Sequence, residues 1–229
     1  MAESYEKQRQ FITDASHEIK TPLTIIDANI EVLEMEHGEN QWTKSTRNQV
    51  KRLTSLTQQL ITLSKMDEEK NILERVEFSL SDAVLESVKS FEALIKTQNK
   101  KMDVEIEEDI FYFGDEMTIR QMIGILMDNA VKYSIDEGRI RVLLKRKGKK
   151  VQLQFFNETE AIPQGKQDVL FERFYRLDTS RNSETGGSGI GLSVAKAIVA
   201  SNKGKISAYS TDGNSLTVEI VLQNNYNTF

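Results

Sequence analysis

The first third of the chain carries an apolar pattern with the period of an α-helix. Two sets of positions recur every seven residues, and the second set lies four residues after the first: Ile12, Ile19, Ile26 and Leu33, with Ser16, Leu23 and Ile30. A seam this narrow is typical of helices that pack as in a coiled coil. We therefore expect one long helix over this segment.

A second helix is predicted from about Gln41 to Glu68. Its apolar stripe again has helical spacing and consists of Val50, Leu53, Leu56, Leu60, Leu63 and Met66. The intervening Glu36–Asn40 is typical of a turn, so the two helices should form an antiparallel hairpin. One hairpin cannot bury its own stripe, and we expect two copies to pair into a dimeric four-helix bundle. The alternative is a hairpin that packs on the rest of its own chain.

From about Glu77 the pattern mixes helices and strands. We expect, in chain order, a helix over about 80–99, strands within Met102–Phe113, a helix over Asp115–Tyr133 with Asp115 as N-cap, a hairpin of 139–147 and 150–157, a helix over Ser188–Ser201, and a hairpin of 205–210 and 216–222. The turns of the two hairpins are Lys147-Gly148-Lys149 and Asp212-Gly213-Asn214. This order favours an α+β fold, an α/β sandwich, after the hairpin.

The charged stretch 67–71 is the predicted domain boundary. It gives a helical hairpin domain over 1–68, a linker over 69–76 and a second domain over 77–229.

Composition narrows the classes of function. Lys and Arg total 30 and Asp and Glu total 35, so the net charge is −5 and a nucleic-acid partner is not expected. The chain has no Cys and two His, which excludes disulfides and a structural zinc site. No apolar run approaches the roughly 18 residues of a membrane span. We expect a cytoplasmic chain without membrane contact of its own, which leaves open the cytoplasmic part of a membrane-anchored protein.

His17 is the first candidate for chemistry. It lies off the apolar seam, so its ring should face solvent and keep a free nitrogen as a nucleophile. Glu18 can orient the imidazole or take its proton. Pro22 should bend the helix just past His17, because it removes one hydrogen bond and clashes with the carbonyl of Glu18. The plainer alternative is an incidental surface histidine.

The whole string from Phe11 to Leu23, Phe-x-x-x-x-Ser-His-Glu-Ile-Lys-Thr-Pro-Leu, resembles the phosphoacceptor box of sensor histidine kinases. In that family the histidine accepts the γ-phosphoryl group of ATP. The resemblance implies this role for His17, an acid/base role for Glu18, and a part for Thr21 in dephosphorylating the partner response regulator.

A glycine-rich segment, Gly186-Gly187-Ser188-Gly189-Ile190-Gly191-Leu192-Ser193, opens a predicted helix. Glycines let the backbone approach phosphates, and the N–H groups of a helix N-terminus attract anions. The segment is not a Walker loop, because no Gly-Lys-Ser/Thr follows. It resembles the second glycine box and ATP lid of the same kinases, which implies nucleotide contacts from residues 187–192. Taken by itself it could equally be a loop without a ligand.

Two further segments resemble boxes of the same family. Met122–Ser134 resembles the asparagine box, which implies that Asn129 binds Mg²⁺ through its amide oxygen and that Lys132 and Tyr133 contact the nucleotide. Without the resemblance it is an ordinary amphipathic helix. Leu170–Arg176 resembles the phenylalanine box, which implies nucleotide contacts from Tyr175 and Arg176, the latter as a γ-phosphate clamp. We assign Phe171 and Phe174 as core anchors beside a lid over 178–185.

The first glycine box departs from the family pattern. The family reads Asp-x-Gly-x-Gly, whereas the chain reads Asn157-Glu158-Thr159-Glu160-Ala161. We expect Asn157 to keep the role of the Asp, since an amide oxygen can also accept a hydrogen bond from the adenine amine. An Asn that only satisfies its own turn is the alternative.

The sequence is therefore identified, by resemblance over about residues 8–222, as the catalytic core of a sensor histidine kinase. The resemblance implies ATP and Mg²⁺ as ligands, a homodimer, a sandwich of the gyrase and heat-shock chaperone type, and transfer of the phosphoryl group to the receiver domain of a response regulator. It also implies the cytoplasmic part of a membrane-anchored sensor. Two rivals remain: an ATPase of the same sandwich fold, and a degenerate kinase that serves as a binding module or phosphatase.

Overall fold

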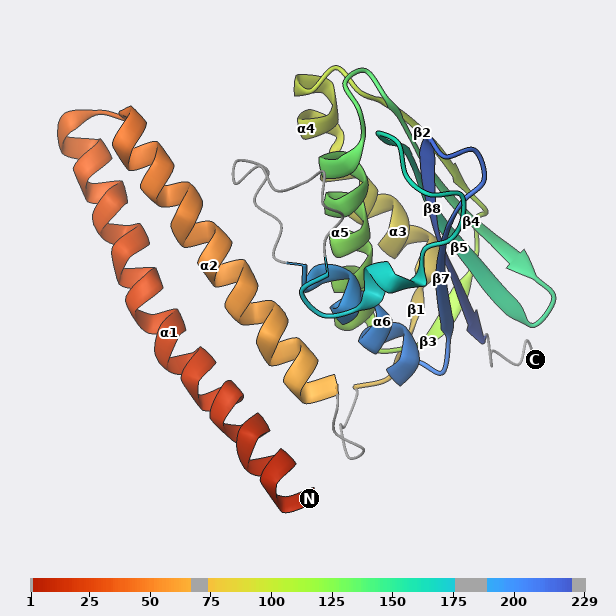
Figure 1. The fold of residues 1–229 in the computed structure, drawn as a ribbon, viewed down its shortest axis with the longest axis horizontal. Helices are drawn as coiled ribbons and strands as arrows, with labels where there is room; N and C mark the ends of the chain where they lie inside the picture. Colours follow the sequence, from red (N-terminus) through yellow and green to blue (C-terminus); the bar gives the residue numbers. More distant parts are fainter. Residues whose placement is uncertain (1, 67–73, 176–188, 224–229) are drawn as a thin grey trace. The chain divides into compact units, whose positions relative to one another are not determined.

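The computed structural model describes residues 2–66, 74–175 and 189–223, with side chains described from residue 18 onward and up to 64 in the first of these ranges (Figure 1). The chain divides into two compact units, one of Met1–Asn71 with Asn182–Ile190 and one of Ile72–Arg181 with Gly191–Phe229. The domain limits expected from the sequence remain a prediction.

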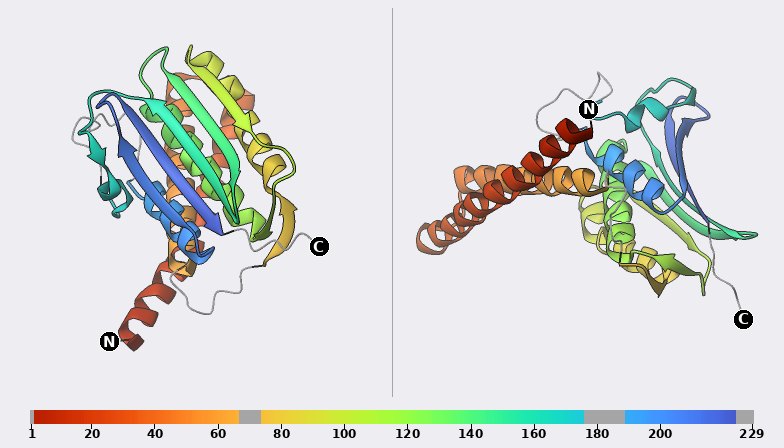
Figure 2. Two further views of the ribbon diagram at one scale, coloured as in Figure 1. Left: turned by 90° about the vertical axis from the view of Figure 1, so that its right-hand side faces the viewer. Right: turned by 90° about the horizontal axis from the view of Figure 1, so that it is seen from below.

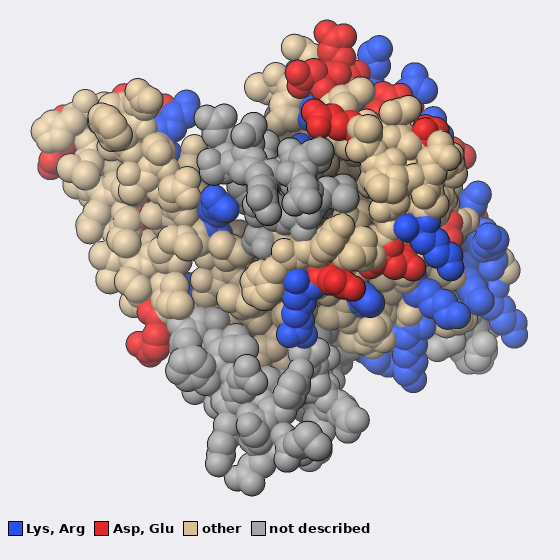
Figure 3. Space-filling view, viewed as in Figure 1, with Lys and Arg blue, Asp and Glu red and all other residues tan. Residues whose placement is uncertain are grey.

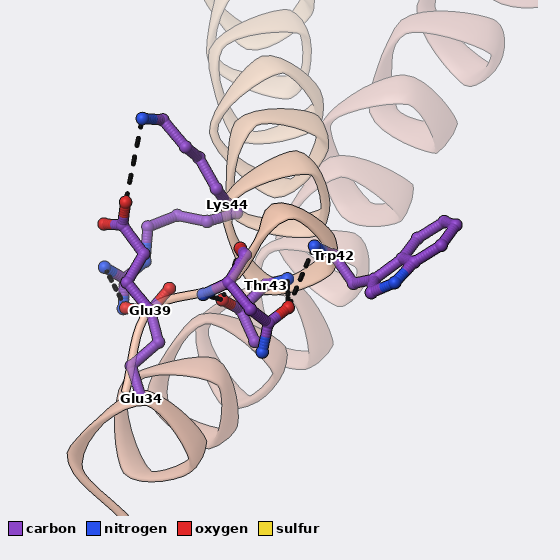
Figure 4. Close-up of polar contacts among 7 residues, drawn as sticks. Glu34, Glu39, Trp42, Thr43 and Lys44 are labelled. Carbon is purple, nitrogen blue, oxygen red and sulfur yellow. Dashed lines mark hydrogen bonds and ion pairs between the residues drawn. The ribbon is translucent and has the colours of Figure 1, made fainter. Parts of the chain in front are cut away.

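The first unit is the predicted antiparallel hairpin, of α1 (Ala2–His37) and α2 (Gln41–Met66). Local hydrogen bonds build its turn (Figure 4). The Oδ1 of Asn40 accepts the N–H groups of Trp42 at 2.9 Å and Thr43 at 3.0 Å, and the Oγ1 of Thr43 accepts the N–H of Asn40 at 3.1 Å. This reciprocal cap starts α2. Gly38, at φ 77°, ends α1 in the left-handed conformation that glycine adopts freely.

The heptad seam of α1 divides into two sets. Leu23 and Ile30 pack with Val50 of α2 in a buried cluster, at 5–6% exposure. Ile19, Ile26 and Leu33 remain 41–48% exposed. The seam is therefore wider than the contact within one hairpin, and three of its five members with described side chains stay exposed in a single chain.

An ion pair joins the two helices beside this cluster. The guanidinium of Arg47 on α2 lies 2.7 Å from a carboxylate oxygen of Glu34 and 3.8 Å from one of Asp27, both on α1. The Glu34 side chain is only 12% exposed, so the pair is largely withdrawn from water.

The second unit is built on a six-stranded sheet. Its strands, in spatial order, are β2 (Lys101–Ile106), β4 (Arg139–Lys147), β5 (Lys150–Glu158), β8 (Ser215–Gln223), β7 (Lys205–Ser210) and β6 (Gly165–Lys166). β2 and β4 pair in parallel and the other neighbours pair antiparallel. A separate pair consists of β1 (Val76–Ser79) and β3 (Phe111–Gly114).

Helices cover one face of the sheet (Figure 2). They are α3 (Leu80–Lys89), α4 (Glu92–Thr97), α5 (Glu116–Tyr133) and α6 (Gly191–Ser201), with a 3₁₀ turn over Asp168–Phe171. Leu153 and Phe155 of β5 and Ile123 and Met127 of α5 are at most 2% exposed, so the core lies between helices and sheet. The predicted α/β sandwich is confirmed.

Several local predictions are confirmed. The Oδ1 of Asp115 accepts the N–H of Thr118 at 2.9 Å and caps α5. Gly148 and Gly213 have φ of 63° and 77° in the turns of the two predicted hairpins. Phe171 is a core anchor, at 3% exposure.

Other predictions need correction. The helix expected over about 80–99 is two helices. The helix is interrupted at Ser90 and Phe91, where the N–H of Phe91 donates to the carbonyl of Val88. The last helix begins at Gly191 rather than at Ser188, which lies outside the described residues. Phe174 is not a core anchor: it is 68% exposed at φ 64°, because the chain turns there. The short strands β1 and β6 were not expected.

Basic side chains gather at the turn between β4 and β5. Lys and Arg, in blue, cluster at the right of the view in Figure 3, where this turn lies. The exposed members are Lys145, Arg146, Lys147, Lys149 and Lys150.

Within the described residues, no helix combines the length and the apolar character needed to cross a membrane.

Candidate nucleotide and phosphoacceptor site

One face of α5 carries three of the predicted nucleotide residues. Asn129, Lys132 and Tyr133 are all half-buried, and their spacing of three and four residues places them on one side of the helix. The opposite side is held by buried residues such as Met127 and Val131, at 0–2% exposure. The Nζ of Lys132 lies 5.2 Å from the centre of the Tyr133 ring, within cation–π range. The apolar side of α5 thus fixes a polar side that combines an amide, a cation and an aromatic ring.

Asp128, beside Asn129, has a perturbed carboxyl group. Burial raises its pKa, and the nearby charge of Lys132 acts in the opposite direction. Among the side chains that the structure describes, no three acidic or histidine groups gather as a ready metal site. A metal ion at Asn129 would therefore take its other oxygen ligands from phosphate and water.

The N-terminus of α6 lies against α5. A Cβ added to Gly191 would meet the Cγ2 of Ile125 at 3.3 Å, which is tighter than ordinary contact. Ile125 precedes Asn129 by one turn, so the first turn of α6 lies beside the turn that leads to Asn129. The first N–H groups of a helix have no partner within it and favour anions. Gly191 permits this close approach, and Gly189, at φ 70°, redirects the chain before it.

Asn157 is the polar exception in a core strand. It shares the helix-covered face of β5 with Leu153 and Phe155, and it is 3% exposed. Its strand neighbours are Ile140 and Leu216, and its Nδ2 donates a long bond of 3.4 Å to the carbonyl of Glu158. β5 ends one residue later, so Asn157 lies at the strand end, as the sequence predicts, and the basic turn lies at the other end of β5.

The degenerate glycine box is held by the turn between β7 and β8. The N–H groups of Thr159 and Ile162 donate to the carbonyls of Asn214 and Gly213, each at 2.9 Å. The Oδ1 of Asp212 accepts bonds from the N–H of Asn214 and the hydroxyl of Ser215, and these bonds lower the pKa of Asp212. Backbone bonds therefore order this segment without the two family glycines.

Sequence reasoning missed two polar residues that hold the end of α5. The Nζ of Lys100 donates to the carbonyls of Val131 at 2.5 Å and Ser134 at 2.9 Å. Glu158 accepts the N–H of Ile135 on its carbonyl at 3.1 Å and that of Arg139 on its carboxylate at 2.8 Å. Lys100 belongs to no recognisable motif, and Glu158 lies in the degenerate glycine box without a role assigned to it there, so only the fold brings them to α5.

The remaining predicted residues are placed in part. Glu18 and Thr21 are exposed on α1, one turn apart. The backbone of His17 is helical, but its side chain is not described, so its solvent-facing ring stays a prediction. The bend at Pro22 also stays a prediction. Outside the described residues lie Arg176, Gly187 and Ser188. Tyr175 is half-buried, and its N–H donates to the carbonyl of Glu172 at 3.3 Å. Ile190 and Leu192 flank Gly191 at the start of α6.

Two family models match the chain. Residues 7–69 match the His Kinase A (phospho-acceptor) domain, and residues 114–225 match the histidine kinase-, DNA gyrase B- and HSP90-like ATPase. The first match includes His17, and the second includes Asn129, Asn157 and the start of α6.

Similar curated proteins are sensor kinases. Sensor protein DltS of Streptococcus agalactiae is 34% identical over 94% of this chain and 54% of its own length. The signal transduction histidine-protein kinase ArlS of Staphylococcus epidermidis is 30% identical over 95% of this chain and 49% of its own length. The chain thus spans about half the length of these relatives.

Solved structures show the same fold. The histidine kinase AdeS of Acinetobacter baumannii is 25% identical, with a TM-score of 0.67 over 92% of this chain and 98% of that one. Full-length ShkA, solved in complex with AMPPNP, is 16% identical, with a TM-score of 0.76 over 94% of this chain and 46% of that one.

Proposed function

The chain belongs to the sensor histidine kinases, and on that premise we propose that it transfers the γ-phosphoryl group of ATP to His17 and then to an aspartate of a response regulator. One observation carries the proposal. A single chain combines the phosphoacceptor match around His17 with an ATPase match whose polar α5 face lies beside the N-terminus of α6.

The described residues fit Mg-ATP. The first turn of α6, from Gly191, offers N–H groups to phosphate, and Lys132 offers a cation on the neighbouring helix. Asn129 would bind Mg²⁺ through its amide oxygen, and the metal would neutralise phosphate charge. Tyr133 would lie against the nucleotide. Asn157, buried at the end of β5, would accept a hydrogen bond from the adenine amine.

The remaining nucleotide contacts are proposed from the family boxes. Tyr175 and Arg176 would come from the phenylalanine box, with Arg176 on the γ-phosphate. The other contacts, from the second glycine box, would be Gly187, Ser188, Gly189, Ile190 and Leu192.

The chemistry is a phosphoryl transfer to nitrogen. A ring nitrogen of His17 forms a bond to the γ-phosphorus, the bond to the β,γ-bridging oxygen breaks, and ADP leaves. Glu18, one residue on, takes the imidazole proton or orients the ring. Such transfers depend mainly on positioning and on stabilising charge. The phosphoryl group then passes to an aspartate oxygen on the regulator, and His17 is restored.

We further propose that the hairpin pairs with a second copy. Ile19, Ile26 and Leu33 continue the seam whose other half is buried against α2, and they are exposed in one chain. Leu53 of α2 is also 48% exposed. A four-helix bundle of two hairpins would cover these side chains.

The partner is proposed to be a receiver domain. A solved structure of the histidine kinase ThkA, 22% identical with a TM-score of 0.65, is in complex with the response regulator protein TrrA. In this chain, Thr21 lies exposed one turn from His17, where its hydroxyl would orient a water that dephosphorylates the regulator. We propose that the chain acts in the cytoplasm, as the cytoplasmic part of a longer, membrane-anchored sensor.

Incubation with γ-labelled ATP and Mg²⁺ tests the proposal. A kinase gives label on the protein that is lost in acid and kept in alkali, as expected of phosphohistidine. Release of labelled phosphate without labelled protein would instead support an ATPase of the same fold. If neither labelled protein nor released phosphate were found, the result would support a degenerate binding module. The loss of the two glycines of the first glycine box favours this rival.

A further inference from the structure

The ammonium of Lys100 clamps the backbone on both sides of Lys132 and Tyr133. Its Nζ donates to the carbonyl of Val131, directly before this pair, and to the carbonyl of Ser134, directly after it. The two bonds, at 2.5 and 2.9 Å, thus bracket the two residues proposed to contact the nucleotide. Lys100 itself is 31 residues away along the chain from Val131.

The backbone around Lys100 is fixed before its side chain reaches α5. The N–H of Lys100 donates to the carbonyl of Ile95 at 3.1 Å, at the end of α4. The next residue, Lys101, donates its N–H to the carbonyl of Gly138 at 3.0 Å and begins β2, which runs parallel to β4. Lys100 therefore has a defined base from which to hold the last turn of α5.

The last turn of a helix suits a cation. Its final carbonyls have no partner within the helix and carry the negative end of the helix dipole. Lys100 supplies a charged donor to the carbonyl of Val131 in this turn, and Asp136 lies close enough to oppose the loss of the proton. Burial still lowers the pKa of Lys100, which shows that the group is partly withdrawn from water.

We propose that Lys100 is a positioning residue for the nucleotide site, which sets ATP affinity by fixing Lys132 and Tyr133 at the end of α5. The proposal rests on the function proposed above, because it assigns Lys132 and Tyr133 to the nucleotide. Lys100 touches no reacting atom, so its effect is on binding rather than on the transfer step.

Other bonds allow the fold to survive without this ammonium. Glu158 holds the loop after α5 through the N–H groups of Ile135 and Arg139, and Gly138 donates to the carbonyl of Ile135 at 3.0 Å. The apolar side of α5 also remains buried. Loss of Lys100 should therefore loosen the last turn of α5 without unfolding the domain.

The experiment compares Lys100→Met, Lys100→Gln and Lys100→Arg in the full chain, with Lys96→Met as control. Lys96 is an exposed lysine four residues earlier, on α4. The rate of protein labelling is measured against Mg-ATP concentration, and thermal unfolding is measured on each variant. Should Lys100→Met fail to fold, Lys100→Gln, which keeps an uncharged amide donor group, carries the same comparison.

Lys100→Met should raise the KM for ATP about tenfold while kcat stays within about twofold, the pattern of lost binding rather than lost transition-state contact. Lys100→Gln should fall between Lys100→Met and the unmodified protein. Lys100→Arg should recover most of the affinity, and Lys96→Met should match the unmodified protein. In a Lys132→Met background, Lys100→Met should raise KM less than about threefold, because Lys100 acts through a residue already removed.

Three results would overturn the inference. One is an unchanged KM in folded Lys100→Met, and another is a fall in kcat at unchanged KM. The third is a full tenfold effect that persists in the Lys132→Met background, which would indicate a general structural role. Failure of the unmodified protein to bind ATP at all would instead overturn the proposed function and, with it, this inference.

Discussion

Replacement of Asn157 tests how the chain recognises the base of its nucleotide. We expect Asn157→Ala to weaken ATP binding and Asn157→Asp to bind ATP as well as the unmodified protein or better. We propose the Oδ1 of Asn157 as the acceptor for the adenine amine, at the position where the family has an aspartate. A charged oxygen gives a stronger hydrogen bond to the adenine amine than a neutral one does.

The magnitude follows from what the side chain does in the free protein. Among the described residues its one side-chain bond, to the carbonyl of Glu158, is 3.4 Å long, so the loss of this bond costs the fold little. In the complex, Asn157→Ala leaves the adenine amine unpaired in a site where Asn157 is only 3% exposed. An unpaired donor of this kind costs about 1–2 kcal/mol, which corresponds to about a tenfold loss of ATP affinity.

Calorimetry with Mg-ATP measures this loss, and thermal unfolding confirms that each variant is folded. GTP is the matched competitor, because guanine presents a carbonyl oxygen where adenine presents an amine. GTP should compete poorly with ATP for the unmodified protein. If Asn157→Ala bound ATP like the unmodified protein, or GTP competed equally, Asn157 would not read the base and the degenerate module would gain support.

Three further changes probe the metal, the regulator and the hairpin. Asn129→Ala should abolish Mg²⁺-dependent nucleotide binding in a folded domain, and unchanged Mg-ATP affinity by calorimetry would mean that another residue holds the metal. Thr21→Ala should leave labelling from ATP largely intact and slow dephosphorylation of the regulator, and an unchanged rate would argue against its role. Arg47→Met should lower the free energy of unfolding, measured in urea, by about 2 kcal/mol, because Glu34 loses the cation 2.7 Å away. The control Lys51→Met, at an exposed site of α2, should change this free energy by less than about 0.5 kcal/mol. Equal effects of Arg47→Met and Lys51→Met would show that the ion pair adds no stability.

The hydrophobic pattern predicted the hairpin but not the division of its seam. Leu23 and Ile26 both belong to the heptad pattern of α1, yet Leu23 is 6% and Ile26 41% exposed. A seven-residue repeat marks a face that will be covered without showing which partner covers each half. Only the packing of α2 against α1 separates the two sets.

The proposed nucleotide site was predictable where its signal is local. Asn129, Lys132 and Tyr133 lie within five residues of one helix, and Asp115 caps that helix with a bond to Thr118. Lys100 was not predictable, because its contact with Val131 spans 31 residues and depends on how β2 runs beside β4. Long-range polar contacts of this kind leave no periodic trace in a sequence.

The error at Phe174 has a different cause. Aromatic spacing in Leu170–Arg176 treats Phe171 and Phe174 alike, but Phe174 has a φ of 64° and points to solvent, whereas Phe171 is 3% exposed. A single residue in the left-handed region marks a turn of the chain, and aromatic spacing does not reveal it. Such a change in backbone direction is visible only in the structure.

The position of the labelled phosphoryl group tests the central claim most directly. The unmodified protein and His17→Gln are incubated with γ-labelled ATP and Mg²⁺, and ATP binding is measured on both by calorimetry. We expect acid-labile label on the unmodified protein and none on His17→Gln, with ATP binding equal in the two. Label retained on His17→Gln would contradict this expectation, because the phosphoryl group would then be accepted elsewhere.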